Sequence, residues 1–349
     1  MLRLHLLPET PDDGPTYACA AIRLLNPWRH PSLAGQVEVT TGRRLPGGRI
    51  DAIITQRGGP LDATLAEVQG LVRDARLRRI PLVCDLDDDL LTEHTSLAVE
   101  AQLTASNIRP RVRFLLREAD AVTVSTPALA ARLGRLNPAI HVWPNALDER
   151  LALPLPAGEG AELGYFGTLS HLEDLLTVLG PLETALARRP GRPRVEFCGV
   201  AEDGRIGQLF AGVADVTLLP VDGDYPGFMR ARQRQAPWAA GIAPLADSAF
   251  NRGKSDIKFL DYALFGAPGI YADLPVYAEV HDGETGLKAA PGEFGTALLR
   301  LLEDPPLRRR IRTQAREWVL EQRVLARRAP ELLGILHRVL DRAPGAAAA

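Results

Sequence analysis

Long apolar runs, paired cysteines and an excess of either charge are all missing from this sequence. No segment reaches the roughly 18 uninterrupted apolar residues of a membrane-spanning helix, so we expect no transmembrane segment. The three cysteines are far apart and odd in number, which gives neither a zinc motif nor a disulfide framework and favours a reducing compartment. Lys and Arg number 41 against 43 Asp and Glu, so no basic field is available for nucleic acid. We expect a cytoplasmic protein and leave open whether it touches the inner face of a membrane.

What remains is the composition of a globular protein. Hydrophobic residues make up 46% of the chain and charged residues 24%, both ordinary values for folded domains. A length of 349 residues is enough for two domains, each with its own core. The apolar run within residues 1–14 is too short for a signal peptide and lacks a small-residue cleavage site, so it is better interpreted as a first strand.

Short β-like runs alternate with longer helical patterns, which predicts an α/β architecture with parallel sheets. Strands are expected at 2–7, 51–56, 81–86, 121–125, 140–145, 163–167, 194–199, 216–221, 241–246 and 269–272. Helices are expected at 61–77, 127–136, about 171–188, about 255–265 and through 293–342. Thr126 and Pro127 are typical cap and first-turn residues for the second of these helices.

The alternation is interrupted once, by a stretch rich in proline and glycine at 146–162. The sequence therefore predicts two Rossmann-like doubly wound domains, at 1–150 and 160–310, facing each other across a cleft. Helices at 311–342 should follow and cross back to the first domain. Ligands bind outside the carboxyl ends of the strands in such sheets, so we expect the site in the cleft.

Charged residues crowd the start of the otherwise apolar helix at 255–265. Lys254 precedes this helix, Ser255 or Asp256 can cap it, and Lys258 and Asp261 share one of its stripes. Backbone amides at a helix start and nearby lysines favour a bound phosphate, and an aspartate one turn further can accept hydrogen bonds from vicinal hydroxyls. The alternative is a solvated helix start with an internal Lys–Asp pair.

The acidic run "CDLDDDL" lies at the carboxyl end of the strand expected at 81–86. Asp87 and Asp88 can act as a catalytic base or orient an acceptor hydroxyl. An Asp-x-Asp pair can instead bind a metal ion. A third interpretation is a haloacid-dehalogenase-like phosphatase with Asp85 as nucleophile and Asp87 beside it. A solvated loop with capping aspartates is the fourth.

The stretch "GKSDIKFLDYALFGAPGIYADLPVYAEVHDGETGL", residues 253–287, resembles the donor-binding segment of GT-B glycosyltransferases of the group 1, family 4-like kind. In that segment a helix with an acidic residue is followed by a small-residue turn, a short strand and a second glycine turn. The stretches at 119–133, 142–148 and 163–186 also resemble parts of these enzymes, in the same order. The resemblance covers residues 50–325.

The resemblance implies sugar transfer from a nucleotide-sugar donor, as co-substrate, to an acceptor hydroxyl, with retention at the anomeric carbon and with neither metal nor cofactor. The second domain would bind the donor and the first the acceptor, which can be a glycan, a lipid-linked sugar or a small molecule. Asp261 corresponds to the acid that binds ribose hydroxyls. Ser170 lies close to the expected glycine turn. The expected donor-binding residues are Gly167, Thr168, His171, Lys254, Ser255, Asp256, Lys258 and Asp261.

One departure from this pattern keeps another class of function open. Many relatives have a second acid eight positions before the ribose acid, where this chain has Gly253. Asp256 or Asp247 would have to replace it. Otherwise the sugar would be held differently, or the chain would be a nucleotide-sugar-binding protein without catalysis. Arg57, at the end of the strand expected at 51–56, can face the cleft and the donor phosphates or form a surface salt bridge.

Overall fold

The computed structural model describes residues 1–10, 15–94, 96–168, 171–199, 205–221 and 224–342, which fold into two compact units. The first unit contains Met1–Glu149, Gly253–Ser255 and the chain from Val324 onward. The second contains Arg150–Arg252 and Asp256–Arg323. The three residues Gly253–Ser255 therefore belong to the first unit although both of their flanking segments belong to the second.

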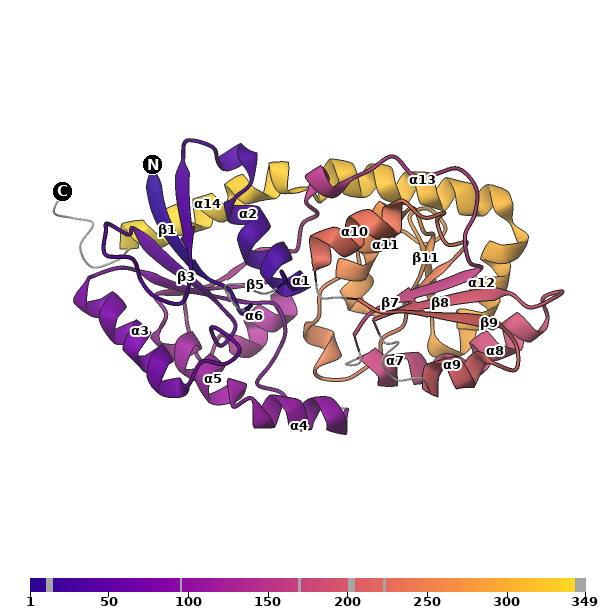
Figure 1. Cartoon of the computed structure of the whole chain (residues 1–349), viewed down its shortest axis with the longest axis horizontal. Coiled ribbons are helices and arrows are strands. Elements are labelled where there is room, and N and C mark those ends of the chain that lie inside the picture. The colour runs from indigo at the N-terminus through magenta and orange to yellow at the C-terminus, as the bar shows by residue number, and fades with distance from the viewer. Residues whose placement is uncertain (11–14, 95, 169–170, 200–204, 222–223, 343–349) are drawn as a thin grey trace. The chain divides into compact units, whose positions relative to one another are not determined.

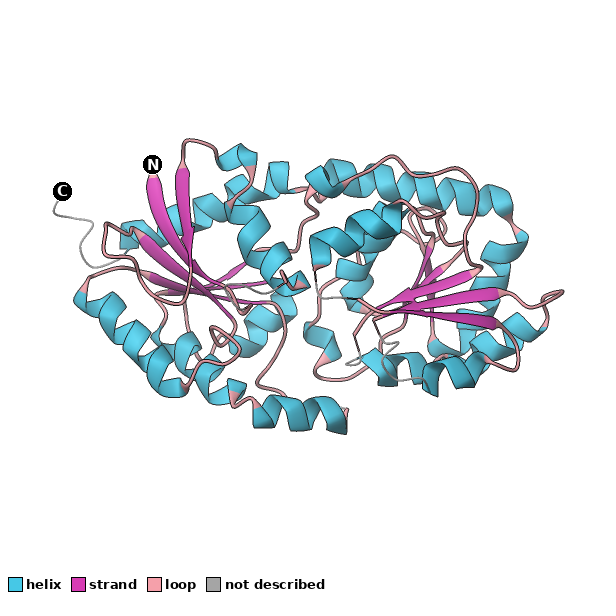
Figure 2. Ribbon diagram, viewed as in Figure 1, coloured by secondary structure: helices cyan, strands magenta, loops and turns pink. Residues whose placement is uncertain are grey.

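A six-stranded, all-parallel sheet with the order β2-β1-β3-β4-β5-β6 forms the centre of the first unit (Figures 1 and 2). Its strands are β1 (Leu2–Leu7), β2 (Val37–Thr41), β3 (Ala52–Gln56), β4 (Leu82–Leu86), β5 (Ala121–Val124) and β6 (Ile140–Val142). The order reverses between β1 and β3, so the carboxyl ends of these two strands form the switch point where α/β sheets bind ligands.

Helices cover both faces of this sheet, as Figure 1 shows. They are α1 (Ala18–Ala20), the π-helical turn η1 (Ala21–Leu25), α2 (Asn26–Trp28), α3 (Leu65–Leu77), α4 (Leu97–Ala105), α5 (Ile108–Glu118), α6 (Pro127–Leu133) and α14 (Leu325–Arg342). Buried residues of α3 and α5 pack on one face, and those of α2 and α14 on the other. The helix starts follow local sequence: Thr64 and Glu67 form a reciprocal capping box for α3.

The second unit is built in the same way around a parallel sheet with the order β12-β11-β10-β7-β8-β9. Its strands are β7 (Leu163–Phe166), β8 (Arg194–Cys198), β9 (Asp215–Leu219), β10 (Gly241–Ala243), β11 (Gly269–Ala272) and β12 (Leu287–Ala289). The order reverses between β7 and β10, so the switch point of this sheet lies at the turns after those two strands.

The helices of the second unit are α7 (Leu172–Leu176), α8 (Leu179–Ala187), α9 (Arg205–Phe210), α10 (Tyr225–Gln233), α11 (Ile257–Phe265), α12 (Phe294–Glu303) and α13 (Pro305–Gln322). Figure 1 shows α8, α9 and α12 on one side of the sheet and α10, α11 and α13 on the other. The short 3-10 turns of the two units are η2 (Pro31–Leu33), η3 (Glu149–Leu151), η6 (Asn251–Gly253), η7 (Pro275–Tyr277) and η8 (Pro291–Glu293).

The predicted α/β class with two parallel, doubly wound sheets is confirmed. Thr126 caps α6 as expected, since its hydroxyl accepts a hydrogen bond from the Leu129 amide at 3.2 Å. Gly266 ends α11 at φ 71°, a left-handed conformation that suits glycine. The helix expected at 171–188 is two helices, because Pro181 has no amide hydrogen and fits only the first turn of α8.

Two short strands were not predicted from the sequence. β2 is five residues long and has no fully buried residue, although its half-buried Val37 and Val39 alternate with exposed residues and pack against the core. β12 is only three residues long. The helices expected at 311–342 are also divided differently: α13 belongs to the second unit, and the chain passes to the first unit between Arg323 and Val324. No helix among the described residues is long and apolar enough to cross a membrane.

The close approach of β7 to Trp238 gives a test of the packing in the second unit. A Cβ atom on Gly164 would lie 1.8 Å from Cδ2 of the fully buried Trp238. Gly164→Ala should therefore lower the free energy of unfolding by about 2–3 kcal/mol through overpacking. Chemical denaturation measures this change.

Gly180→Ala is the matched control for that substitution. Nothing lies within 4 Å of a Cβ atom on Gly180, which is exposed in the first turn of α8. Alanine there should be neutral or stabilise the protein by up to about 1 kcal/mol. Equal effects of the two substitutions would contradict the packing described for β7.

Candidate functional site

The turn after β7 lies at the switch point of the second sheet and carries Gly167 and Thr168. Below it is the buried ring of Tyr165, whose hydroxyl would lie 2.5 Å from a Cβ atom on Gly167. The ammonium group of Lys258, from α11, lies 5.5 Å from the centroid of the same ring. The Tyr165 ring thus lies beside both the glycine turn and Lys258. The Lys258 ammonium group makes a cation–π contact with the ring, and the missing side chain of Gly167 lets the backbone lie close to the Tyr165 hydroxyl.

The start of α11 is held by its N-cap residue, Asp256, in an unusual way. The Asp256 side chain makes no capping hydrogen bond to the helix. Instead, its two carboxylate oxygens accept hydrogen bonds from Arg323 at 2.9 and 3.0 Å, and Arg323 also pairs with Glu279. Burial raises the pKa of Asp256, against the opposing effect of Arg323. No carboxylate from the N-cap therefore neutralises the partial positive charge of this helix start.

Asp261 is buried one turn further along α11. Its Oδ1 accepts a hydrogen bond from the hydroxyl of Tyr225, in α10, at 2.7 Å. Burial raises the pKa of Asp261 to about 7, against the lowering effects of the Tyr225 hydrogen bond and of Lys258. The carboxyl group is consequently poised between its neutral and ionised forms near neutral pH, as ligand-binding carboxyls in dry sites often are.

His171 and Asp174 form a second polar group near the same edge of the sheet. Nδ1 of His171 lies 2.8 Å from Oδ2 of Asp174. The other oxygen of Asp174 accepts hydrogen bonds from the Ala246 amide at 2.9 Å and from the Asn251 side chain at 2.8 Å. Burial opposes ionisation of Asp174, but these bonds, the one to His171 foremost, lower its pKa below the usual value. Asp174 thus fixes His171 to the segment that follows β10. Ser170 lies outside the described residues.

In the first unit, Arg57 is the centre of an ion-pair network at the switch point. It follows β3 with φ 51°, a strained conformation for a residue other than glycine. Its guanidinium group binds both oxygens of Asp87 at 2.6 and 3.0 Å and also contacts Glu9 at 3.0 Å. Burial opposes ionisation of Asp87, but the pairing with Arg57 lowers its pKa. Asp87 is therefore an ionised group of fixed orientation.

Asp88 is the more loosely held of the two carboxylates. Its oxygens lie 3.4 Å from Arg57 and 3.4 Å from the ammonium group of Lys254. Lys254 belongs to the three-residue segment Gly253–Ser255, which two more hydrogen bonds attach to the first unit. Thr126 donates to the carbonyl of Gly253 at 2.9 Å, and Asn145 donates to the hydroxyl of Ser255 at 2.8 Å.

The structure therefore divides the expected donor residues between the two units. Lys254 and Ser255 lie in the first unit, with Asp87 and Asp88. The second unit contains the others, Gly167, Thr168, His171, Asp256, Lys258 and Asp261. Within the second unit, Lys258 is brought to the glycine turn, Asp261 lies one turn beyond it in α11, and Asp256 is engaged by Arg323.

Asp85 is placed as a structural residue. It is 2% exposed, and Arg23 from the π-helical turn contacts its two oxygens at 3.1 and 2.7 Å. The hydroxyl of Thr123 donates a third hydrogen bond at 2.7 Å. A buried carboxylate that accepts three hydrogen bonds, two of them from an arginine, is poorly placed to attack a phosphoester. This geometry disfavours the phosphatase interpretation.

The sequence analysis did not single out four members of the polar groups described above: Glu9, Asp174, Tyr225 and Asn251. Glu9 lies two residues after the end of β1, so its position after a strand was an available signal. Asp174 lies three residues after His171, so this pairing also had a local signal. Tyr225 contacts Asp261 and Asn251 contacts Asp174 through tertiary structure, and no local pattern marks such contacts in advance.

The sequence matches no protein-family profile and no curated protein, whereas the fold has clear counterparts among solved structures. HepE from Anabaena, in a complex with UDP-glucose, is similar over 97% of this chain and 100% of that chain, with a TM-score of 0.65 and 16% identity. Sucrose-phosphate synthase from Thermosynechococcus elongatus is similar over 99% and 100% of the two chains, with a TM-score of 0.62 and 16% identity. TarM from S. aureus gives a TM-score of 0.59 and 9% identity over 83% of this chain, which spans only 54% of TarM.

These similarities define the class of fold. Two doubly wound parallel units followed by a C-terminal helix are the architecture of the GT-B glycosyltransferases, and this chain has that fold. The expectation drawn from residues 253–287 is confirmed at the level of the fold.

The raised pKa of Asp261 predicts a pH dependence of stability. Below pH 7 the folded protein keeps a proton on Asp261 that the unfolded chain, with a pKa near 3.8, has already released. The stability that this proton on Asp261 contributes is therefore fully present below about pH 4 and is lost as the pH rises through 7. The free energy of unfolding of the wild type, minus that of Asp261→Asn, should fall by at most about 4 kcal/mol between pH 4 and pH 8.

Urea denaturation of both proteins across this pH range measures the difference. Asp215→Asn is the control, because Asp215 is exposed at the start of β9 and pairs only with the exposed Arg192 among the interactions described. Parallel pH profiles for the wild type and Asp261→Asn would show that Asp261 does not titrate near neutrality.

The buried pair of Arg23 and Asp85 predicts a large loss of stability when one partner is removed. Asp85→Asn leaves the guanidinium group of Arg23 buried without its counter-ion, which should cost about 3–5 kcal/mol in chemical denaturation. Arg3→Gln, which breaks the exposed pair with Glu38, should cost less than about 1 kcal/mol. An Asp85→Asn protein as stable as the Arg3→Gln protein would refute the structural role of Asp85.

Proposed function

We propose that this protein is a glycosyltransferase that moves a sugar from a nucleotide-sugar donor to an acceptor hydroxyl. The observation that carries the proposal is the GT-B fold combined with a cationic, dry site at the switch point of the second sheet. The HepE structure, similar along nearly its whole length, contains UDP-glucose. We further propose a retaining, metal-independent, hexosyltransferase-like reaction.

The second unit is the proposed donor-binding part. The start of α11, which lacks a side-chain cap, and Lys258 would take the diphosphate, because helix amides and an ammonium group both favour a bound anion. Asp261 would accept hydrogen bonds from ribose hydroxyls, and these bonds favour its ionised form. The glycine turn at Gly167 would let the backbone come close to the phosphates.

Leaving-group stabilisation is the proposed source of catalysis. As the bond between the anomeric carbon and the diphosphate breaks, negative charge grows on the diphosphate. Preorganised cations and helix amides stabilise that charge in the transition state. Meanwhile the acceptor oxygen forms the new bond to the anomeric carbon, and its proton passes to the leaving diphosphate. Such a step needs no metal ion.

The first unit is the proposed acceptor-binding part, with Asp87 and Asp88 as its polar groups. Because its pairing with Arg57 keeps the pKa of Asp87 low, this carboxylate suits the orientation of a hydroxyl better than the removal of a proton. Asp88, which is held more loosely, is the proposed contact to the acceptor hydroxyl.

A thermal-shift screen with UDP-, GDP-, dTDP- and ADP-sugars, each with and without EDTA, tests the donor site. A ligand present at about 100 times its dissociation constant should stabilise the folded protein by roughly 2.7 kcal/mol. UDP-glucose is the first donor to test. We expect one nucleotide family to shift the wild type in the presence of EDTA, and we expect Lys258→Met and Asp261→Asn to lose that response.

Asp215→Asn should respond as the wild type does, because Asp215 lies at the amino end of β9, away from the carboxyl edge of the sheet. No response to any nucleotide sugar would contradict the proposal. A response confined to magnesium with a simple phosphate would instead favour the phosphatase interpretation. Donor binding with neither transfer nor hydrolysis would identify a binding protein without catalysis.

A further inference from the structure

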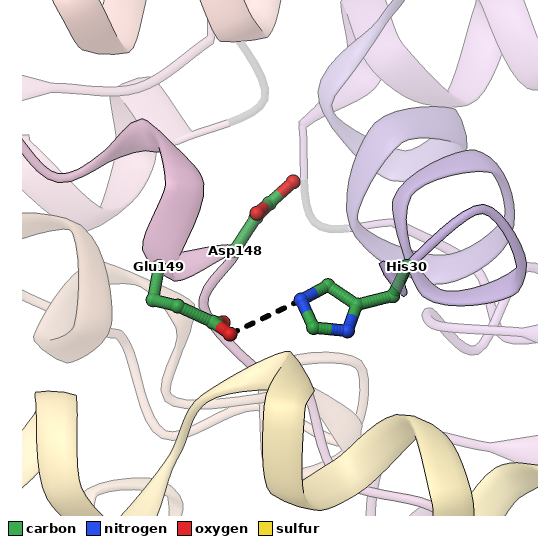
Figure 3. Close-up of side chains that lie close together, drawn as sticks. All are labelled: His30, Asp148 and Glu149. Atoms are coloured by element: carbon green, nitrogen blue, oxygen red, sulfur yellow. Dashed lines mark ion pairs between the residues drawn. The ribbon is translucent and has the colours of Figure 1, made fainter. Parts of the chain in front are cut away.

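A cluster of one histidine and two carboxylates lies in the first unit, outside every group discussed so far. His30 follows α2 and precedes the 3-10 turn η2, and Asp148 and Glu149 close the first long segment of this unit. One potential ligand atom from each residue lies within 4.8 Å of those of the other two. Figure 3 shows the Glu149 carboxylate facing the imidazole of His30, with Asp148 beside them.

The imidazole of His30 is buried and oriented toward the carboxylates. His30 is 6% exposed, and its Nδ1 lies 2.8 Å from the hydroxyl of Ser32. Its Nε2 makes no hydrogen bond of acceptable geometry among the described residues and lies 3.1 Å from Oε1 of Glu149. Nδ1 also accepts a hydrogen bond from the Ser32 amide at 3.2 Å. Metal binding through Nε2 therefore requires the proton to move to Nδ1, where it would be donated to the Ser32 hydroxyl, the supporting hydrogen bond that a metal-bound histidine makes.

The two carboxylates are also positioned by the fold. Asp148 is buried and Glu149 half-buried. Oε2 of Glu149 accepts a hydrogen bond from the amide of Ala326, in the first turn of α14, at 3.4 Å. Ligating carboxylates commonly have a further partner of this kind, so additional interactions of either carboxylate are compatible with a bound cation.

We propose that His30, Asp148 and Glu149 bind a divalent transition-metal ion of the Zn²⁺ type. Nitrogen and carboxylate ligands lie about 2.0–2.2 Å from such an ion, which places tetrahedral ligand atoms about 3.4 Å apart. The ligand atoms of the three residues, which lie within 4.8 Å of one another, would therefore have to approach by up to roughly 1.4 Å. One imidazole and two carboxylates suit Zn²⁺, Co²⁺ or Mn²⁺, whereas Mg²⁺ and Ca²⁺ prefer oxygen ligands alone. Water would complete the coordination.

This ion would have a structural role. It would tie the loop before η2 to the end of the first long segment and, through Glu149, to the start of α14. None of the residues proposed for the donor or the acceptor belongs to the cluster. The proposal is therefore independent of the proposed function and compatible with sugar transfer that needs no metal.

Metal titration of the full chain tests the proposal. The protein is treated with EDTA, freed of chelator and titrated with Zn²⁺ by calorimetry and with Co²⁺ by visible absorption. We expect one ion per chain, with the absorption bands of Co²⁺ bound to nitrogen and oxygen ligands. His30→Ala and Glu149→Gln should each weaken binding at least about ten-fold. Glu149→Gln keeps the shape of the side chain and is the variant that tests the site if His30→Ala fails to fold.

His141→Ala and Glu38→Gln are the matched controls, because they remove an imidazole in β6 and a carboxylate in β2 away from the cluster. Both should bind the ion as the wild type does. The proposal is overturned if the wild type binds no ion in a one-to-one ratio, or if Glu149→Gln binds as tightly as the wild type. It is also overturned if a control variant loses the site.

Discussion

The buried contact between Arg23 and Asp85 is the interaction on which the architecture of the first unit depends. Arg23 also donates to the carbonyl of Trp143 at 2.6 Å and to the side chain of Asn145 at 3.1 Å, and its guanidinium group lies over the Trp143 ring. One side chain thus joins the π-helical turn to β4 and to the segment after β6. With Asp85 fixed inside the sheet, the chain leaves β4 at its carboxyl edge, and Asp87 and Asp88 emerge beside Arg57.

The two sheets use charge differently at corresponding places. At the switch point of the first sheet, Arg57 pairs with Glu9 and Asp87, and its positive charge lowers the pKa of Asp87. In the second unit, the Tyr225 hydroxyl and Lys258 lower the pKa of Asp261, but burial outweighs them. The first environment provides fixed negative charge. The second provides a carboxyl whose ionisation a ligand can shift, which is why we propose the donor role for this unit.

Most of the helices and strands named in the sequence analysis could be predicted from local sequence. The strand and helix periods, the cap at Thr126 and the turn at Gly266 are all properties of neighbouring residues, so they could be predicted with no knowledge of the tertiary structure. β2 was missed because its alternation consists of only two half-buried residues, Val37 and Val39, within a strand of five residues. The break between α7 and α8 was missed for another reason: a proline in a first turn looks, in sequence, like a proline inside a longer helix.

For the candidate site, the sequence by itself determined which residues carry charge and which strand or helix end they follow. Asp87 and Asp88 could be singled out because they follow a strand, and parallel strands bring their carboxyl ends to one edge. Lys258 and Asp261 were singled out by the charged start of their helix and by the resemblance of residues 253–287 to GT-B glycosyltransferases. Only the tertiary structure decided what each group contacts: Asp85 and Asp256 are bound by arginines distant in sequence, and Lys254 by Asp88. The physical reason is that ionisation and availability depend on burial and on partners many residues away, and neither is encoded in local spacing.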